Sequence, residues 1–240
     1  LEKMVGMFAI GVWDKREERL FLTRDRMGEK PLYFGWSGGN FVFASELKAI
    51  RSLTTFDNSI DKGALCLFLR HTYIPSPLSI YQNIYKLQPG FILDLNLKAT
   101  NSPPIDIFDS TEININQYWS LRDTYQIGRS NLISNEQEAI EALECSLKES
   151  IKLQSIADVP LGCFLSGGID SSLIASLMQS ESATPVHSYT IGFNEPGYNE
   201  ATFAKEVAKH IGTKHTELYV SSKDAYCCQN RTASAHSSEE

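Results

Sequence analysis

This 240-residue sequence has no excess of positive charge. Its 29 acidic residues outnumber its 22 lysines and arginines, which gives a net charge of −7 and a pI near 5.3. General nucleic-acid binding needs a basic face, so this balance argues against it, although single nucleotides stay eligible as ligands. The sequence also has no run near the ~18 consecutive apolar residues of a membrane helix, and its first residues do not form a signal peptide. We therefore expect a globular protein with no nucleic-acid or membrane partner.

Metal-ligand spacing is absent from the five cysteines. Cys66 and Cys145 fall within helical patterns and Cys163 within an apolar run, so we expect each of them to be a small core residue and not a reactive thiol. Cys227 and Cys228 are adjacent and define no disulfide framework. This usage favours a reducing, cytoplasmic compartment.

The sequence does contain a strand–turn–helix pattern around residue 166. The apolar run 161–165 has the length of a buried strand, small residues at 166–168 mark a sharp turn, and apolar residues then recur at helical spacing. Such a turn aims backbone N–H groups and the positive end of a helix at an anion, and glycines let the backbone approach it closely. The pattern predicts a phosphate site.

Polar side chains add to this predicted site. Ser166, Ser171 and Ser172 supply hydroxyl donors, and Asp170 places one carboxylate beside the anion. That carboxylate would repel phosphate unless a hard cation bridges the two groups, which implies Mg²⁺. The loop is not a Walker loop, because no lysine follows the glycines.

Two kinds of pattern divide the chain. Up to residue 95, short alternating segments and a helix after Asp61 predict antiparallel β structure. From Ser134, which has the position of an N-cap, helices alternate with strands, and this alternation predicts a parallel sheet. Residues 96–117 have no sustained period and are interpreted as a loop, so we place the domain boundary near residue 117. The predicted fold class is α+β followed by α/β. The strands expected from these patterns are 7–13, 19–23, 32–36, 41–44, 91–95, 161–165, 186–193 and 216–220, and the later helices are 135–154, one after residue 168, and one from Asn199 to Gly212 with Phe203 facing inward.

These motifs carry a family resemblance. The segment Ser166-Gly167-Gly168-Ile169-Asp170-Ser171-Ser172 resembles the SGGxDSS PP-loop of ATP pyrophosphatases, and its flanks resemble glutamine-dependent asparagine synthetase. Segments 6–14, 24–33, 43–49 and 86–90 are similar, in family order, to the later part of a class II glutamine amidotransferase domain. The resemblance implies the C-terminal portion of an Ntn-hydrolase-like α/β/β/α domain at 1–117. It implies the start of a parallel-sheet PP-loop domain, of the adenine nucleotide alpha hydrolase-like type, at 118–240.

The resemblance also implies ligands and site residues. ATP and Mg²⁺ are the implied cofactors, and Asp170 is the implied metal ligand. Leu165 and Ile191 match family positions whose backbones border adenine, although a purely packing role stays open for both. The implied ATP-binding residues are Leu165, Ser166, Gly167, Gly168, Asp170, Ser171, Ser172 and Ile191.

The chain departs from the family pattern at both ends. The amidotransferase nucleophile is an N-terminal cysteine, whereas this sequence opens with Leu1, so we expect a fragment that lacks both ends of the family and contains no catalytic residue. Residues 225–240 lose the resemblance and the apolar periodicity, and we expect a non-native tail there. Arg24-Asp25-Arg26 is interpreted as ion pairs that fix a turn, in preference to an active-site charge cluster.

The implied activity is ATP-dependent amidation of aspartate to asparagine. Glutamine is the nitrogen donor, β-aspartyl-AMP is the intermediate, and AMP and pyrophosphate are released. The implied partners are aspartate, glutamine and ATP, and a homo-oligomer is allowed. Two alternatives stay open. One is another PP-loop adenylating ligase, such as a β-lactam synthetase-like or peptide- or sugar-amidating homologue, and the other is a non-catalytic fragment, inactive on its own.

Overall fold

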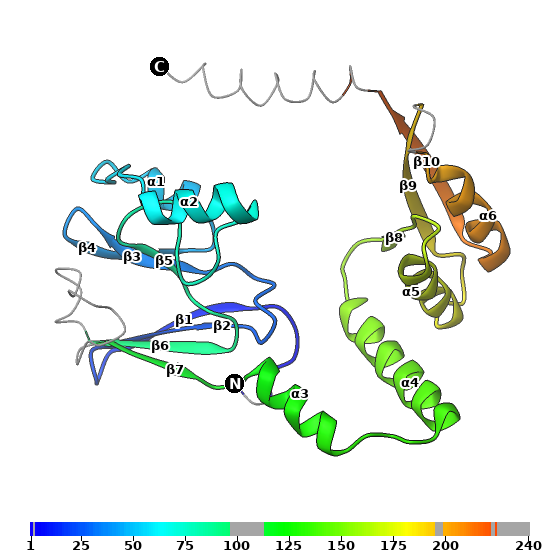
Figure 1. Cartoon of the computed structure of the whole chain (residues 1–240), viewed down its shortest axis with the longest axis horizontal. Helices are drawn as coiled ribbons and strands as arrows, with labels where there is room; N and C mark the ends of the chain where they lie inside the picture. Colours follow the sequence, from blue (N-terminus) through cyan, green and yellow to red (C-terminus); the bar gives the residue numbers. More distant parts are fainter. Residues whose placement is uncertain (2, 97–112, 195–198, 222–223, 225–240) are drawn as a thin grey trace. The chain divides into compact units, whose positions relative to one another are not determined.

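Short strands with one apolar face build two antiparallel sheets in the N-terminal part of the chain (Figure 1). The computed structural model describes residues 1, 3–96, 113–194, 199–221 and 224, and it divides into two compact units, Leu1–Leu132 and Ile133–Glu240. The sheets of the first unit have the strand orders β1-β2-β6-β7 and β4-β3-β5. The strands are β1 (Ala9–Asp14), β2 (Arg19–Arg24), β3 (Tyr33–Ser37), β4 (Asn40–Ala44), β5 (Ile84–Lys86), β6 (Phe91–Asn96) and β7 (Ile113–Gln117), and the helices are α1 (Leu47–Arg51), α2 (Lys62–His71) and α3 (Leu121–Ser130).

Both sheets contribute to one apolar core. Its buried members come from β2, β3, β6 and β7 and from the segments beside β3 and β5, so the two sheets pack against each other. Burial of this apolar surface is the main favourable contribution to the unit's stability. The buried core residues are Leu22, Leu32, Phe34, Trp36, Leu87, Leu93, Leu95 and Ile113.

Two local predictions for the first unit are confirmed. Gly38 and Gly39 form the β3–β4 turn with φ of 56° and 79°, the positive values that a two-residue hairpin turn requires. Asp61 is the N-cap of α2, and its Oδ1 accepts a hydrogen bond of 2.9 Å from the N–H of Ala64.

The predicted loop at 96–117 is wrong at its end. Residues 113–117 form β7, which pairs antiparallel with β6, and Ile113 and Ile115 alternate with asparagines as a half-buried strand requires. Helix α3 follows and was not predicted; Ser120 is its N-cap. The first unit therefore ends after the boundary placed near residue 117, and the domain ranges themselves stay a prediction.

The second unit contains a parallel sheet with the strand order β10-β9-β8, and β9 and β10 lie side by side in Figure 1. Its elements are α4 (Glu136–Gln154), β8 (Gly162–Phe164), α5 (Ile169–Ser180), β9 (His187–Phe193), α6 (Ala201–Ile211) and β10 (Lys214–Val220). Small residues let α5 and α6 pack closely on one face of this sheet. Their buried cluster consists of Leu165, Ala175, Ala204 and Ala208. The coarse fold prediction, antiparallel sheets followed by a parallel sheet, is confirmed.

Several details of the second unit differ from the predictions. The N-cap of α4 is Asn135, whose side chain accepts from the N–H of Glu138 at 3.0 Å, and not Ser134. Phe203 on α6 does not face inward, since 66% of it is exposed. The run 161–165 is not a fully buried strand, because β8 lies at an edge of the described sheet and Phe164 is exposed.

The cysteines also differ from the prediction. Cys66 and Cys145 are exposed free thiols and not core residues, because their helices turn these positions toward solvent. Cys163 is half-buried, and burial raises the pKa of its thiol. The predicted tail at 225–240 lies outside the described residues. Across the described part of the chain, each helix is too short or too polar to span a membrane.

Candidate functional site

The loop between β8 and α5 leaves the sheet at a firmly held residue. Leu165 is 1% exposed, its N–H donates to the carbonyl of Tyr189 at 2.9 Å, and the hydroxyl of Thr190 donates to the carbonyl of Leu165. These bonds from β9 fix both backbone polar groups of Leu165 before the chain turns away. Thr190 was not predicted as part of the site, because its hydroxyl is only one of many strand hydroxyls in the sequence.

Serine hydroxyls close the loop on itself. Ser171 Oγ lies 2.9 Å from Ser166 Oγ and accepts from the N–H of Ser166 at 3.2 Å. Ser166 Oγ also accepts from the N–H of Gly168 at 3.3 Å. Two of the predicted phosphate-binding hydroxyls therefore hold the loop's shape in this structure, and a ligand would share them.

The first turn of α5 presents N–H groups without intrahelical acceptors. Gly168 is the N-cap in an extended conformation and offers no side chain to cap the helix. The first helical bond runs from the N–H of Ser172 to the carbonyl of Gly168 at 3.1 Å, so the N–H groups of Ile169, Asp170 and Ser171 precede the hydrogen-bonded ladder. Free N–H groups and the helix dipole together favour an anion here.

Gly167 is required by the packing of the loop against α6. It has a φ of 80°, in the left-handed region, and a Cβ there would lie 2.8 Å from Phe203 Cβ and 2.9 Å from the N atom of Ala204. Both distances are shorter than real Cβ contacts allow. α6 therefore holds the loop from one side, a contact that the loop motif alone does not predict.

Two side chains of the loop fit a cation and an anion. The Asp170 carboxylate is exposed, and nothing in the described part of the chain bonds to it. Ser172 Oγ is buried without a hydrogen-bond partner among the described residues, which is uncommon for a hydroxyl. No cluster of three or more His, Cys, Asp and Glu side chains within the described ranges could hold a metal. A lone carboxylate still fits Mg²⁺, which commonly takes one or two carboxylates and completes its shell with water and phosphate oxygens.

Ile191 lies beside this loop on the neighbouring strand. It follows Thr190, the residue that bonds Leu165, and it pairs with Leu218 of β10. Its side chain is on the exposed face of the sheet. If Ile191 has the purely packing role left open above, that role is therefore not in a buried core of the described residues. The structure thus brings Leu165, the loop and Ile191 together at the carboxyl ends of β8 and β9, where ligands of open parallel sheets bind.

The Arg24-Asp25-Arg26 cluster has a structural environment. Arg24 donates to the carbonyls of Lys30 at 2.9 Å and Leu87 at 2.8 Å. Asp25 is 1% exposed, and its carboxylate accepts from the N–H groups of Lys30 and Glu29, each at 2.9 Å. The prediction that this cluster fixes a turn holds. The hydrogen bonds of Arg24 and Asp25 given above go to backbone groups.

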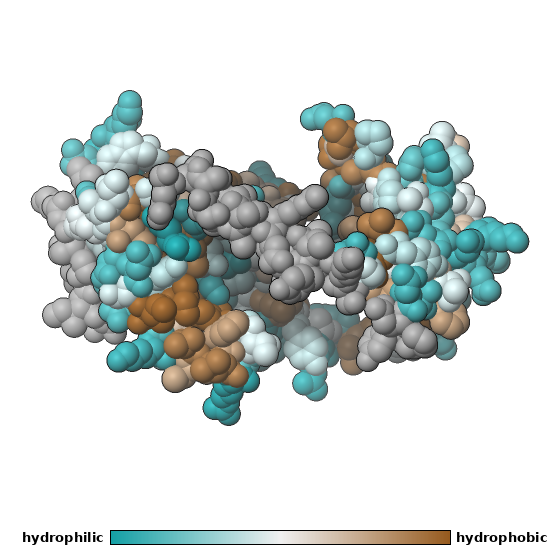
Figure 2. Space-filling view, turned by 90° about the horizontal axis from the view of Figure 1, so that it is seen from above, coloured by the Kyte–Doolittle hydropathy of each residue, from teal (hydrophilic) through white to brown (hydrophobic). Residues whose placement is uncertain are grey.

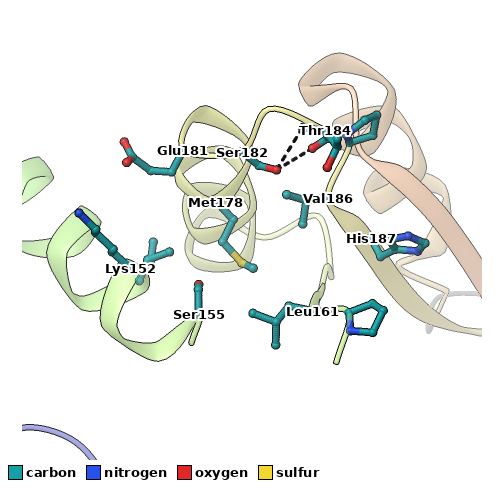
Figure 3. A pocket seen from close by; sticks show the side chains of 12 residues that line it. Lys152, Ser155, Leu161, Met178, Glu181, Ser182, Thr184, Val186 and His187 are labelled. Atoms are coloured by element: carbon teal, nitrogen blue, oxygen red, sulfur yellow. Dashed lines mark hydrogen bonds between the residues drawn. The ribbon is translucent and has the colours of Figure 1, made fainter. Parts of the chain in front are cut away.

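Two cavities lie away from the predicted site. One, of about 520 Å³, opens between α4, the end of α5 and the start of β9, and Lys152, Glu181 and His187 line it (Figure 3). This is the end of the sheet opposite the loop. The other, of about 340 Å³, belongs to the first unit and is lined by Arg26, Trp119 and Arg122 among others. Neither cavity includes a loop residue.

Comparison with known families divides the chain in the order that the sequence suggested. Residues 1–104 match the glutamine amidotransferase domain family, and residues 142–236 match the asparagine synthase family.

Curated relatives match nearly the whole chain. A Methanocaldococcus jannaschii protein, provisionally named a glutamine-hydrolysing asparagine synthetase 2, is 34% identical over 224 residues, which is 91% of this chain and 40% of that protein. The glutamine-hydrolysing asparagine synthetase 1 of Bacillus subtilis is 29% identical over 222 residues, 92% of this chain and 32% of that protein. A third, asparagine synthetase 2 of Bacillus subtilis, is 32% identical over 227 residues, 92% of this chain and 28% of that protein. The chain thus spans well under half the length of the curated relatives it matches.

Proposed function

We propose that the enzyme of which this chain is a part amidates aspartate to asparagine, because the chain belongs to the family of glutamine-hydrolysing asparagine synthetases. Glutamine is the nitrogen donor and ATP is the source of activation. In this proposal the aspartate side-chain carboxylate attacks the α-phosphate of ATP and pyrophosphate leaves. Ammonia from glutamine then displaces AMP from the resulting β-aspartyl-AMP. The proposed first unit is part of an Ntn-hydrolase-like amidotransferase domain, and the second is part of a PP-loop domain.

The observation that carries this proposal is the loop from Leu165 to Ser172. The N–H groups at the start of α5 precede the helical ladder, and the hydroxyls of Ser166 and Ser171 lie 2.9 Å apart in the same loop at the carboxyl end of β8. In this proposal they bind phosphate oxygens together with the Ser172 hydroxyl. Negative charge develops on pyrophosphate as it leaves, and prearranged donors stabilise such charge without reorganising. The loop therefore suits release of pyrophosphate from a nucleotide better than it suits a neutral ligand.

Asp170 is the proposed Mg²⁺ ligand. When bound, the ion would neutralise charge on the phosphate oxygens. The chain's own contribution is to hold the Asp170 carboxylate at the second position of α5, exposed and without a competing partner in the described residues. The backbones of Leu165 and Ile191 are the proposed border of the adenine ring, on the neighbouring strand ends.

A cytoplasmic location is part of the proposal. Cys66 and Cys145 are exposed and free, and exposed thiols persist in a reducing compartment.

The Asp170→Asn variant tests the proposed function in the product of the complete reading frame. The variant keeps the shape of the side chain but removes the charge that holds the metal. We expect aspartate-dependent release of pyrophosphate from ATP to fall about 10²–10³-fold, the usual cost of losing one electrostatic contact to the transition state. Asp158→Asn, at an exposed position outside the loop, is the matched control and should leave the rate unchanged.

Assays with ammonia or with glutamine as the nitrogen source distinguish asparagine synthesis from glutamine hydrolysis. Ammonia-dependent and glutamine-dependent synthesis should fall together in Asp170→Asn, since both pass through the adenylate, while glutamine hydrolysis should persist. A rate of pyrophosphate release within about twofold of wild type, under ~1 kcal/mol of effect, would refute the assignment of Asp170.

A further inference from the structure

Thr190, near the carboxyl end of β9, has a buried hydroxyl group. Side chains alternate along this strand, so Thr190 is 5% exposed whereas Ile191 lies on the exposed face. Exposed apolar side chains are not unusual in this chain, since Figure 2 shows apolar residues, in brown, at the surface of both units. A buried hydroxyl, in contrast, requires a hydrogen-bond partner. The Thr190 hydroxyl donates to the carbonyl of Leu165, the residue directly before the loop.

The backbone of β9 faces its two neighbouring strands in alternation. The carbonyl of Tyr189 accepts from the N–H of Leu165, at the end of β8, at 2.9 Å. The carbonyl of Val186, just before β9, accepts from the N–H of Lys214, at the start of β10, at 2.8 Å. Both backbone groups of one residue face the same neighbouring strand, and successive residues face opposite ones. The N–H of Ile191 therefore points to the same side as Tyr189, where β8 ends and the loop begins.

A continued β8–β9 ladder would use this N–H group. In a parallel pair, a residue donates to one residue of the neighbouring strand and accepts from the residue two positions further on. Since Leu165 donates to Tyr189, its carbonyl would accept from the N–H of Ile191. In the structure the Thr190 hydroxyl donates to that carbonyl, and no bond joins the Ile191 N–H to it in the described part of the chain. A side chain thus takes the acceptor that the backbone would otherwise use.

We propose that Thr190 is a positioning residue of the nucleotide site, an inference that rests on the proposed function. By occupying the Leu165 carbonyl, its hydroxyl ends the β8–β9 ladder one bond early. The N–H of Ile191 then remains at the edge of the site for an acceptor atom of the nucleotide base. A backbone N–H without a partner costs free energy, and the bound base removes that cost.

The phosphate side of the site does not depend on this bond. The loop is held in shape by its own groups, through the bonds that join Ser166, Gly168 and Ser171. Loss of the Thr190 hydroxyl should therefore weaken the hold on the base and not the hold on the phosphates. The base takes no part in bond breaking, so its contacts are equally strong before and during the reaction. Their loss raises KM without lowering kcat.

The variants Thr190→Val and Thr190→Ser test the proposal in the product of the complete reading frame. Valine has the shape of threonine without the hydroxyl, and serine keeps the hydroxyl. Calorimetry with Mg²⁺ measures the binding of ATP and of inorganic pyrophosphate, which has no base. We expect Thr190→Val to weaken ATP binding about 5–10-fold, the loss typical of one hydrogen bond, and to leave pyrophosphate binding within about twofold. Thr190→Ser should bind ATP within about twofold of wild type.

Thr213→Val is the matched control. It makes the same chemical change just before β10, where the Thr213 hydroxyl lies 2.8 Å from that of Ser188, at the end of the sheet away from the loop. We expect it to leave ATP binding unchanged. In assays of pyrophosphate release, Thr190→Val should raise the KM for ATP about 5–10-fold and change kcat by less than about twofold.

Three results would overturn the proposal. One is unchanged ATP affinity in Thr190→Val, and another is an equal loss in Thr190→Val and Thr190→Ser. The third is a loss of pyrophosphate binding as large as the loss of ATP binding, which would show that the hydroxyl supports the whole fold and not the hold on the base. Wild-type protein that binds ATP but releases no pyrophosphate with aspartate would contradict the proposed function alone, and the affinities would still decide the role of Thr190.

Hydrogen exchange of the Ile191 amide in the wild-type protein needs no variant, so it decides the case if Thr190→Val does not fold. We expect this amide to exchange fast without nucleotide and at least about tenfold more slowly with ATP and Mg²⁺, because a bonded amide exchanges only after local opening. Exchange that ATP does not slow would contradict the proposal.

Discussion

At the scale of single residues, we expect the two glycines of the loop to have different roles, Gly167 in packing and Gly168 in binding the anion. A pair of variants can distinguish these roles. Gly167→Ala places a Cβ against Phe203 and Ala204 at a positive φ, so we expect it to destabilise the second unit by about 1–3 kcal/mol. Gly168 has a φ of −76°, and a Cβ there meets only Ser166 Oγ, at 3.3 Å. We expect Gly168→Ala to change stability by under ~1 kcal/mol but to weaken ATP binding, because its methyl group occupies the anion's approach.

Circular dichroism of unfolding and calorimetry of ATP binding check the glycine pair. Equal loss of stability in both variants would contradict the packing role given to Gly167. Unchanged ATP affinity in Gly168→Ala would contradict the anion site.

Asp25 gives a pH-dependent prediction. Burial raises the pKa of this carboxyl, but the N–H groups of Lys30, Glu29, Phe8 and Gly28 together outweigh burial, so the pKa lies below its ordinary value. A depressed pKa in the folded state contributes stability above the unfolded pKa. This contribution disappears as the pH falls through the folded pKa, in the acidic range below about 4.

The Asp25→Asn variant isolates this contribution. We expect it to lower the free energy of unfolding of the first unit by about 2 kcal/mol at neutral pH, since buried N–H groups lose a charged acceptor. The difference from wild type should shrink in acid. All three tryptophans, Trp13, Trp36 and Trp119, belong to the first unit, so tryptophan fluorescence reports its unfolding. Glu17→Gln, on the exposed β1–β2 turn, is the control, and a pH-independent difference would refute the account.

At the residue level, the sequence shows which groups lie together only where the chemistry is local. The loop's glycines, serines and aspartate lie together because they are consecutive, so their proximity did not depend on the fold. Thr190 and the contact of Gly167 with Phe203 depend on how β9 and α6 pack, and no local pattern contains that information. Arg24 was expected to form ion pairs, but in the folded turn its guanidinium group donates hydrogen bonds to backbone carbonyls.

At the scale of elements, the start of α4 offers a direct comparison of two neighbouring caps. Asn135 accepts from the N–H of Glu138, while Ser134 lies one residue before this N-cap. We expect Asn135→Ala to destabilise α4 by about 1 kcal/mol and Ser134→Ala to have little effect. Hydrogen exchange of the α4 amides checks both variants, and the reverse order of effects would restore Ser134 as the cap.

Element prediction failed where two patterns overlap. Ser134 and Asn135 are both good caps, and each has an acidic or amide residue three positions later, so spacing alone could not choose between them. β7 was missed because its asparagines are typical of a loop. Only the structure shows that its isoleucines pack on the core of the first unit. Strands β8 to β10 were predicted correctly because they alternate with helices. The difference in burial between the two faces of their sheet became visible only in the structure.

At the scale of the whole molecule, one chain contains a unit that resembles an amidotransferase and a unit for which we propose adenylation at the loop. The two family matches occur in one chain in a fixed order. In the proposed reaction the amide nitrogen and the activated carboxylate arise in different units, so damage to the loop should stop synthesis without stopping glutamine hydrolysis.

The most direct test follows an oxygen atom through the reaction. Aspartate labelled with a heavy oxygen isotope in its side-chain carboxylate is incubated with ATP, ammonia and the product of the complete reading frame, and the products are analysed by mass spectrometry. The account predicts asparagine, pyrophosphate and AMP, with the label in the phosphate of AMP, because the carboxylate oxygen bonds to the α-phosphate. Label in inorganic phosphate with release of ADP, or no transfer of label to phosphate, would contradict it.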